Sequence, residues 1–257
     1  MKKNFSGLTL KIIAIVSMLI DHIGAAVIEP ILSAPNNLSN SQFQTLLHID
    51  YICRDIGRLA FPLFCFLIVE GFLHTRNWKK YLLRLCIFAL ISEIPFDLAF
   101  QRKLIELNAQ NVFFTLAIGL LTIAITKMIR EKFWYYNSNF TINITNLILY
   151  FTSVMSVLVV AMATSILLHT DYNAPGVVAI FIIYTFYPRS REIALLIAVL
   201  FLTVTIDQSE MFAIFDIIFI YFYNGSKGKQ IKYFFYLFYP IHLTILAGIA
   251  TSLIGKV

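Results

Sequence analysis

The sequence predicts an all-α polytopic membrane protein, a single bundle of about nine transmembrane helices. Of its 257 residues, 59% are hydrophobic and only 13% are charged, and the mean hydropathy is +0.80. Soluble domains carry about 25% charged residues, so this composition excludes an ordinary soluble fold. Apolar runs also recur along the whole chain, several of them about as long as the 20 residues needed to cross a bilayer.

The predicted spans follow one another with short connections. They cover residues 8–31, 57–73, 81–100, 112–128, 146–168, 175–186, 193–206, 211–223 and 234–254. The runs at 175–186, 193–206 and 211–223 are short, so we expect them to be tilted, broken or buried in the bundle. Residues 33–58 are predicted to form a polar outer loop that folds over the bundle. No connection is long enough for a second domain, so residues 1–257 are predicted to form one domain.

Basic residues predict the orientation, because loops rich in Lys and Arg stay in the cytoplasm. A cytoplasmic N-terminus and an external C-terminus put every dense cluster on the inner side. These clusters are Arg76/Lys79/Lys80/Arg84, Lys127/Arg130/Lys132, Arg189/Arg191 and Lys227/Lys229/Lys232. The net charge of +6 is therefore a topology signal and does not indicate nucleic-acid binding. We expect a multi-pass protein of the cell inner (cytoplasmic) membrane.

Common soluble-enzyme motifs are missing from the sequence. There is no Walker loop, GxGxxG, HExxH, CxxC pair or GxSxG. This disfavours nucleotide hydrolysis, dinucleotide binding, zinc hydrolysis and serine hydrolase chemistry, and no metal site is predicted. The three cysteines give no disulfide framework.

The first span carries an acid and an imidazole side by side, Asp21 and His22. An ionisable group at this depth costs about 2.5 to 3.5 kcal/mol, so the pair indicates function. Lys11 stands eleven residues earlier, on nearly the same helix face and roughly 16 Å away along the axis. The structural alternatives are a snorkelling Lys11 and an interhelical hydrogen bond by His22. Asp21 lies about 100° around the helix and is predicted to be a structural or pKa-tuning partner.

Glu70 ends the second span near its cytoplasmic side. It is predicted either to orient a histidine or to pair with a cation, with Arg84 or Lys80 as its structural partner across the short inner loop.

Glu93 and Asp97 have i, i+4 spacing around Pro95, so both carboxylates face one way on a kinked helix. Two carboxylates with this spacing could bind a cation, relay protons or pair with the outer cations Arg54 and Arg58. We expect structural pairing, in support of the site.

Polar residues recur in the later spans, including Asn111 at the start of one and His242 inside the last. A second intramembrane imidazole could act as an acid or an oxyanion donor beside a basic one, although a lone His242 is more often a packing residue. Asp171 lies at an outer turn and has no predicted role, and Asp216 lies in mid-membrane.

Segments from the first span to the last resemble the TraX family, the F-pilin N-acetyltransferase type. They are Leu10-Lys11 to Ala14, Asp21-His22-Ile23-Gly24, Ile56-Gly57-Arg58-Leu59-Ala60-Phe61-Pro62, Glu70-Gly71-Phe72, Arg84, Ser92-Glu93-Ile94-Pro95-Phe96-Asp97, Asn111-Val112-Phe113-Phe114-Thr115-Leu116, Asp171-Tyr172, Gly176 and Tyr239-Pro240-Ile241-His242. The first segment is also similar to the opening helix of the broader membrane acyltransferase superfamily. There the cation is usually arginine, whereas Lys11 lacks a bidentate phosphate-binding fork.

The resemblance implies an acetyl-CoA-dependent N- or O-acetyltransferase, with cytoplasmic acetyl-CoA as cosubstrate. The acceptor, on the other side of the membrane, would be the N-terminal amine of a pilin or peptide, or a cell-envelope sugar as in the wider superfamily. His22 would be the general base. The implied catalytic residues are His22, Asp21, His242 and Glu70, and the implied acetyl-CoA-binding residues are Lys11, Arg84 and Asn111.

Two other classes of function stay open on the sequence. A proton-coupled transporter would use the buried ionisable groups as relays, namely Asp21, His22, Glu93, Asp97 and Asp216. A non-catalytic pilin-assembly factor would leave the midplane histidine unexplained. The sequence does not indicate an oligomeric state.

Overall fold

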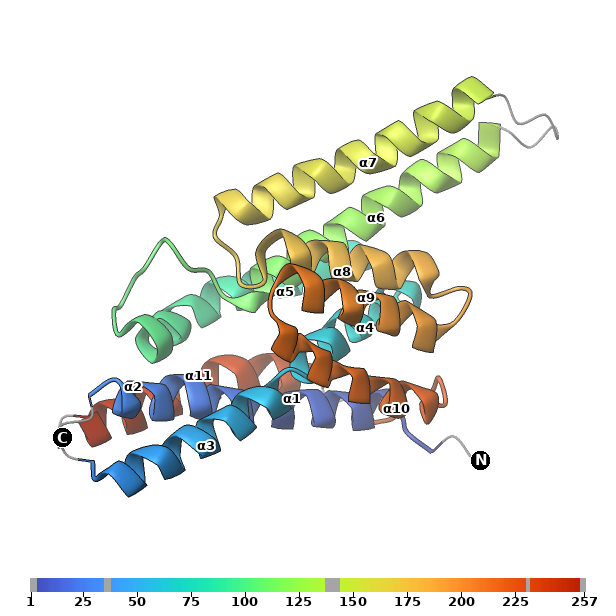
Figure 1. Cartoon of the computed structure of the whole chain (residues 1–257). Helices are drawn as coiled ribbons and strands as arrows, with labels where there is room; N and C mark the ends of the chain where they lie inside the picture. The colour runs from blue at the N-terminus through green and yellow to red at the C-terminus, as the bar shows by residue number, and fades with distance from the viewer. Residues whose placement is uncertain (1–3, 35–37, 137–143, 230–231, 255–257) are drawn as a thin grey trace.

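The computed structural model describes residues 4–34, 38–136, 144–229 and 232–254. In these ranges every regular element is a helix (Figure 1). The elements are α1 (Gly7–Ile23), a π-helical turn (Gly24–Ile28), α2 (Glu29–Leu32), α3 (Asn40–Gly57), α4 (Ala60–Leu73), α5 (Trp78–Phe96), a second π-helical turn (Asp97–Gln101), α6 (Val112–Tyr136), α7 (Ile144–Leu167), α8 (Asn173–Phe186), α9 (Arg191–Thr205), a 3₁₀ segment (Gln208–Phe215), α10 (Asp216–Tyr221) and α11 (Lys232–Ile254). The prediction of an all-α protein is therefore confirmed.

Five helical stretches in the described ranges are long and apolar enough to cross a membrane. They are Gly7–Leu32, Asn40–Leu73, Val112–Phe133, Ile144–Leu167 and Tyr233–Leu253. Helix α8 is apolar but shorter. A multi-pass membrane protein is thus supported, while the number of nine crossings stays a prediction.

The segment predicted as a polar outer loop, residues 33–58, is largely helical, and that prediction is wrong. Helix α3 occupies Asn40–Gly57 and runs directly into α4. Its first turn is stabilised by a capping box, in which the Ser39 hydroxyl accepts the Gln42 N–H and the Gln42 side chain accepts the Ser39 N–H. The sequence of this segment has the composition of a polar loop because α3 is amphipathic and carries polar residues on one face. Residues 35–37 of the predicted loop lie outside the described residues.

Helix α1 is packed along its length by the α3–α4 pair, which runs antiparallel to it. The contact with α3 is close because glycines stand at the crossing. A Cβ added at Gly57 would lie 2.2 Å from Asp21 Oδ1, and one added at Gly24 would lie 2.9 Å from Asp50 Oδ1. Small residues at these positions therefore let α3 bring its charged side chains against the middle of α1.

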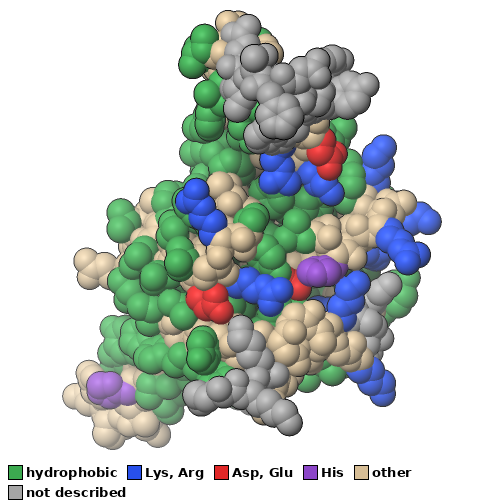
Figure 2. All heavy atoms as spheres, turned by 90° about the vertical axis from the view of Figure 1, so that its right-hand side faces the viewer, with side chains coloured by type: hydrophobic (Ala, Val, Ile, Leu, Met, Phe, Trp, Pro, Cys, Tyr) green, Lys and Arg blue, Asp and Glu red, His purple; other side chains and the backbone are tan. Residues whose placement is uncertain are grey.

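One end of the bundle gathers the chain segments that carry the basic clusters. Figure 2 views the molecule from the side that is on the right in Figure 1, where the described chain begins, and Lys and Arg side chains gather on this face. Contacts that join these segments are Gly7 N–H to Ser226 O (2.7 Å), Lys227 Nζ to His74 O (3.4 Å), Arg191 over the Tyr223 ring (5.1 Å) and Lys127 over the Phe72 ring (5.6 Å). We call this end of the bundle the basic end.

Candidate functional site: two cavities on either side of a histidine pair

The first cavity opens between α1, α4, α5, α6 and α11 and has a volume of about 280 Å³. Its inner wall is apolar and aromatic, and includes Met18, Phe113 and Tyr239. Cationic side chains line it as well, among them Lys11 and Arg84. A cavity of this kind suits a ligand with an apolar arm and an anionic head.

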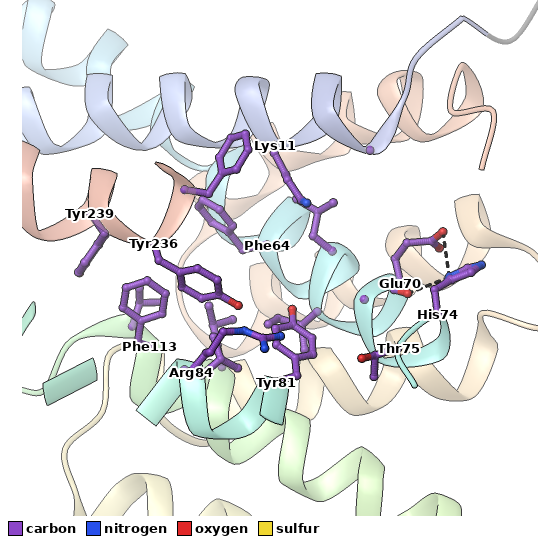
Figure 3. A pocket seen from close by; sticks show the side chains of 18 of the residues that line it. Lys11, Phe64, Glu70, His74, Thr75, Tyr81, Arg84, Phe113, Tyr236 and Tyr239 are labelled. Atoms are coloured by element: carbon purple, nitrogen blue, oxygen red, sulfur yellow. Dashed lines mark hydrogen bonds and ion pairs between the residues drawn. The ribbon is translucent and has the colours of Figure 1, made fainter. Parts of the chain in front are cut away.

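Lys11 and Arg84 approach the first cavity from opposite walls, as Figure 3 shows. Lys11 comes from α1, with its Nζ 5.5 Å from the centre of the Phe235 ring. Arg84 comes from α5 and lies 5.7 Å from the centre of the Tyr81 ring. The sequence-predicted pair is therefore brought to one cavity.

Glu70 also lines the first cavity, but near the basic end. It accepts hydrogen bonds from the Tyr187 and Tyr223 hydroxyls, the latter at 2.8 Å, and lies 3.4 Å from His74 Nδ1. Glu70 forms no ion pair with the predicted structural partners Arg84 and Lys80 in the described part of the chain, because tyrosines that follow α8 and α10 bind it instead. The alternative prediction, that Glu70 orients a histidine, fits His74 and not His22.

The second cavity, of about 290 Å³, has a charged lining that includes three carboxylates and two guanidiniums. Asp21 pairs with Arg54, whose Nη1 is 2.7 Å from Oδ1. Arg58 pairs with Glu210 at 3.0 Å. Asp21 is thus engaged in an ion pair, and its role stays a prediction. Arg54, Arg58 and Glu210 line the same cavity, although none of them was among the predicted site residues. His22 and Asp171 line the same cavity.

His22 is joined to His242 in a hydrogen-bonded chain that ends at a backbone carbonyl. His242 Nδ1 lies 2.7 Å from Phe238 O, and since a carbonyl only accepts, this nitrogen carries the proton. His242 Nε2 is then the acceptor for His22 Nδ1, which lies 2.7 Å away. With both rings neutral, the remaining lone pair is on His22 Nε2. The carbonyl therefore fixes the tautomer that a base in the second cavity requires.

A single layer of side chains separates the two cavities. Tyr239 lines the first cavity and packs edge-on against His22, with ring centroids 5.9 Å apart. Met18 lines the first cavity and His22 the second, one helical turn further along α1. The predicted face of α1 therefore borders both cavities, with Lys11 at the first and His22 at the second.

Both π-helical turns lie next to the second cavity, directly after His22 and around Phe100. Such turns are rare and are frequent at functional sites. Pro30, which has no N–H to donate, follows the first of them. Phe100 packs edge-on against His22, with a centroid distance of 5.2 Å.

Asp171 enters the second cavity from a turn between α7 and α8. Tyr172 and Asn173 have φ of 60° and 40°, in the left-handed region that non-glycine residues rarely adopt. The turn is held by Asp171 N–H donating to Gln110 O at 2.8 Å and by the Thr115 hydroxyl donating to Asp171 O. The surrounding protein raises the pKa of Asp171 to about 6, although the residue itself is exposed.

Asn111, Glu93 and Asp97 belong to a supporting network outside both cavity linings. The Asn111 amide donates to Glu93 and to Ala89 O, and its oxygen accepts the Phe113 N–H, which caps α6. Asp97 accepts the Glu106 N–H at 2.8 Å. A supporting role for the two acids was predicted. Pairing with Arg54 and Arg58 was wrong, because Asp21 and Glu210 occupy those cations.

The fold and the two cavities define a helical, multi-pass membrane protein with a buried polar site. The TraX protein family matches residues 6–250, so the chain belongs to the TraX family. A similar curated protein is the "Probable fimbrial assembly protein FimC, serogroup H1" of Dichelobacter nodosus. It is 32% identical over 271 residues, which cover 95% of this chain and 96% of the relative. No solved structure matches the chain.

Proposed function

We propose that this protein is a transmembrane acetyltransferase of the inner membrane that moves an acetyl group from cytoplasmic acetyl-CoA to the amino terminus of a pilin or peptide outside. The observation that carries the proposal is the pair of cavities that approach each other at His22 and Tyr239. A donor from one side and an acceptor from the other can meet only at such a place. The family and the fimbrial relative support the choice of a pilin-type acceptor.

The first cavity is assigned to acetyl-CoA. By the positive-inside rule, the basic end of the bundle would face the cytoplasm. The cytoplasm is also the compartment that holds acetyl-CoA. Lys11 and Arg84 would contact the phosphates, and the apolar wall near Met18 would receive the acetyl-pantetheine arm. We do not assign Asn111 to this binding, because its side chain lies outside the cavity lining and is engaged within the α5–α6 network.

His22 would act as the general base on the acceptor side. The acceptor ammonium first releases one proton to water, and the neutral amine attacks the thioester carbonyl carbon. As the C–N bond forms, His22 Nε2 takes the amine proton. The tetrahedral intermediate then breaks its C–S bond, and the sulfur leaves as the CoA thiol with the proton from His22. The base is thereby regenerated.

His242 would position His22 and would not polarise the thioester carbonyl. Its Nδ1–H is committed to Phe238 O and its Nε2 to His22. Removing it would free the His22 ring to adopt the other tautomer, with Nε2 protonated and no longer basic.

The test uses the full chain in sealed proteoliposomes, sorted for vesicles whose basic end faces outward. A short peptide with a free amino terminus is trapped inside, and acetyl-labelled CoA is added outside. We expect label on the trapped peptide. In the control, vesicles of the opposite orientation hold both the labelled acetyl-CoA and the peptide inside, with no acetyl-CoA outside. No label is expected there, because the peptide is then on the same side of the membrane as the donor. The variant His48→Ala, at an exposed site on α3, serves as the control that retains transfer. Protein that binds acetyl-CoA yet never labels a peptide would overturn the proposal.

A further inference from the structure

The second cavity contains one more negative charge than its own cations neutralise. Among its lining residues, Arg54 pairs with Asp21 and Arg58 with Glu210. Asp171 is exposed and forms no ion pair within 4.0 Å in the described part of the chain. The cavity beside His22 therefore holds a carboxylate without a cation of its own.

The fold fixes where this carboxylate lies. Asp171 Oδ1 accepts the Tyr172 N–H at 3.0 Å, so the side chain is held against its own turn. Tyr172 in turn stacks on Phe61, with centroids 3.6 Å apart. Left-handed residues such as Tyr172 cost roughly 1 to 3 kcal/mol and persist where the surroundings hold them. This strained turn presents Asp171 at a constant position.

Glu210 offers a second acceptor in the same cavity. Its side chain is fully buried, and Oε1 binds Arg58 at 3.0 Å. Its Oε2 has no hydrogen-bond partner among the described residues. A buried carboxylate oxygen without a donor is unfavourable, so an N–H from a ligand would stabilise it.

We propose that Asp171 and Glu210 form a subsite for a primary ammonium group, the charged amino terminus of the acceptor. This inference rests on the proposed function, because it identifies the acceptor of the same transfer. An ammonium brings one positive charge for Asp171 and three N–H donors, one of which satisfies Glu210 Oε2. A sugar hydroxyl brings one donor and no charge, and would leave Asp171 without a counter-ion. The subsite therefore selects an amine.

Binding without acetyl-CoA tests the subsite separately from turnover. The ligands are three versions of one short peptide, with a free amino terminus, an acetylated one, or a hydroxyl in place of the amine. The full-length protein in nanodiscs should bind the free-amine peptide about 10- to 100-fold more tightly than the other two, as expected for a charge-assisted hydrogen bond. Asp171→Asn, which keeps the oxygen that accepts the Tyr172 N–H, should bind all three alike.

Matched variants exclude a general loss of structure. Asp55→Asn removes a carboxylate from α3 outside the cavity lining and should keep the preference. Glu210→Gln should reduce the preference without abolishing it. The comparison of the three peptides on the wild-type chain requires no variant, so a poorly folding Asp171→Asn does not block the test.

The two proposals fail in different ways. Equal binding of all three peptides by the wild-type chain, or an undiminished preference in a folded Asp171→Asn, would overturn the ammonium subsite even if acetyl transfer is observed. A clear preference for the free amine that disappears in Asp171→Asn would support it. If such a protein nevertheless transfers no acetyl group, the enzyme proposal is wrong and the ammonium subsite stands.

Discussion

The two cavities are similar in volume, about 280 and 290 Å³, but their charges are organised differently. In the first cavity, Lys11 and Arg84 extend over aromatic rings from opposite walls. In the second, Asp21 and Glu210 each hold an arginine at hydrogen-bonding distance. Long cationic side chains over rings adjust to a flexible anionic ligand, whereas interlocked pairs keep a fixed geometry. On the proposed function, the first cavity would bind a flexible anionic cosubstrate, and the second would hold the acceptor and the base at fixed positions.

The largest effect should follow from removing the base between them. His22→Ala is expected to lower kcat by about 10²- to 10⁴-fold, because general-base catalysis contributes that much. Binding of acetyl-CoA should persist, since the cofactor contacts lie in the other cavity. Single-turnover kinetics with labelled acetyl-CoA, beside an equilibrium binding measurement, separate the two quantities. Substantial turnover by a folded His22→Ala would show that the imidazole is not the base.

A stability effect should come next, at the crossing that positions Asp21. Gly57→Ala would place a Cβ 2.2 Å from Asp21 Oδ1, so Asp21 must move away from Arg54. Overpacking of this kind costs typically 1 to 3 kcal/mol, and we expect a lower Tm together with lower activity. The control is Gly248→Ala on α11, where an added Cβ meets no atom within 4 Å. A Gly57→Ala protein as stable and active as Gly248→Ala would show that the crossing tolerates expansion.

The contrast between the cavities also explains what the sequence could and could not predict. Lys11 and His22 were singled out from helical spacing and from charges inside an apolar run, which are local signals, whereas Arg84 was implied by the family resemblance. Arg54 was assigned to a loop, because α3 is amphipathic and lacks the apolar run of a span. Its capping box, from Ser39 to Gln42, was the signal that could have revealed the helix.

Side-chain pairs between distant parts of the sequence could not be predicted from local patterns. Arg58 and Glu210 are separated by 152 positions, and no local periodicity reports which acid meets which cation. The same is true of the pair His22 and His242, 220 positions apart. The tautomer of His22 depends on a carbonyl of α11, so only the assembled bundle reveals it.

Peptide binding in the second cavity should depend on pH, with a change in Kd of about tenfold. With its pKa raised to about 6 by partial desolvation in the surrounding protein, Asp171 is an anion above this pH and neutral below it. A peptide amino terminus stays protonated across pH 5 to 7, because its pKa is about 7.7 to 8.0. The Kd of a free-amine peptide should therefore rise about tenfold from pH 7 to pH 5, as Asp171 becomes neutral. Asp171→Asn should abolish this pH dependence, and a variant that still shows the full rise would assign it to another group.

The smallest effect is expected at the mouth of the first cavity. Lys11→Ala removes one cation that would contact a CoA phosphate, and Lys11 lies over Phe235 on a long side chain. Contacts between partly exposed charges contribute about 0.2 to 1 kcal/mol, so the KM for acetyl-CoA should rise only about two- to fivefold. The kcat should change less, because a phosphate contact is made in the ground and transition states alike. Arg84→Ala should behave in the same way, and steady-state kinetics at low and high salt measure both. A loss of kcat with unchanged KM in Lys11→Ala would show that this lysine takes part in the chemistry, and the first cavity would no longer be a site for cosubstrate binding alone.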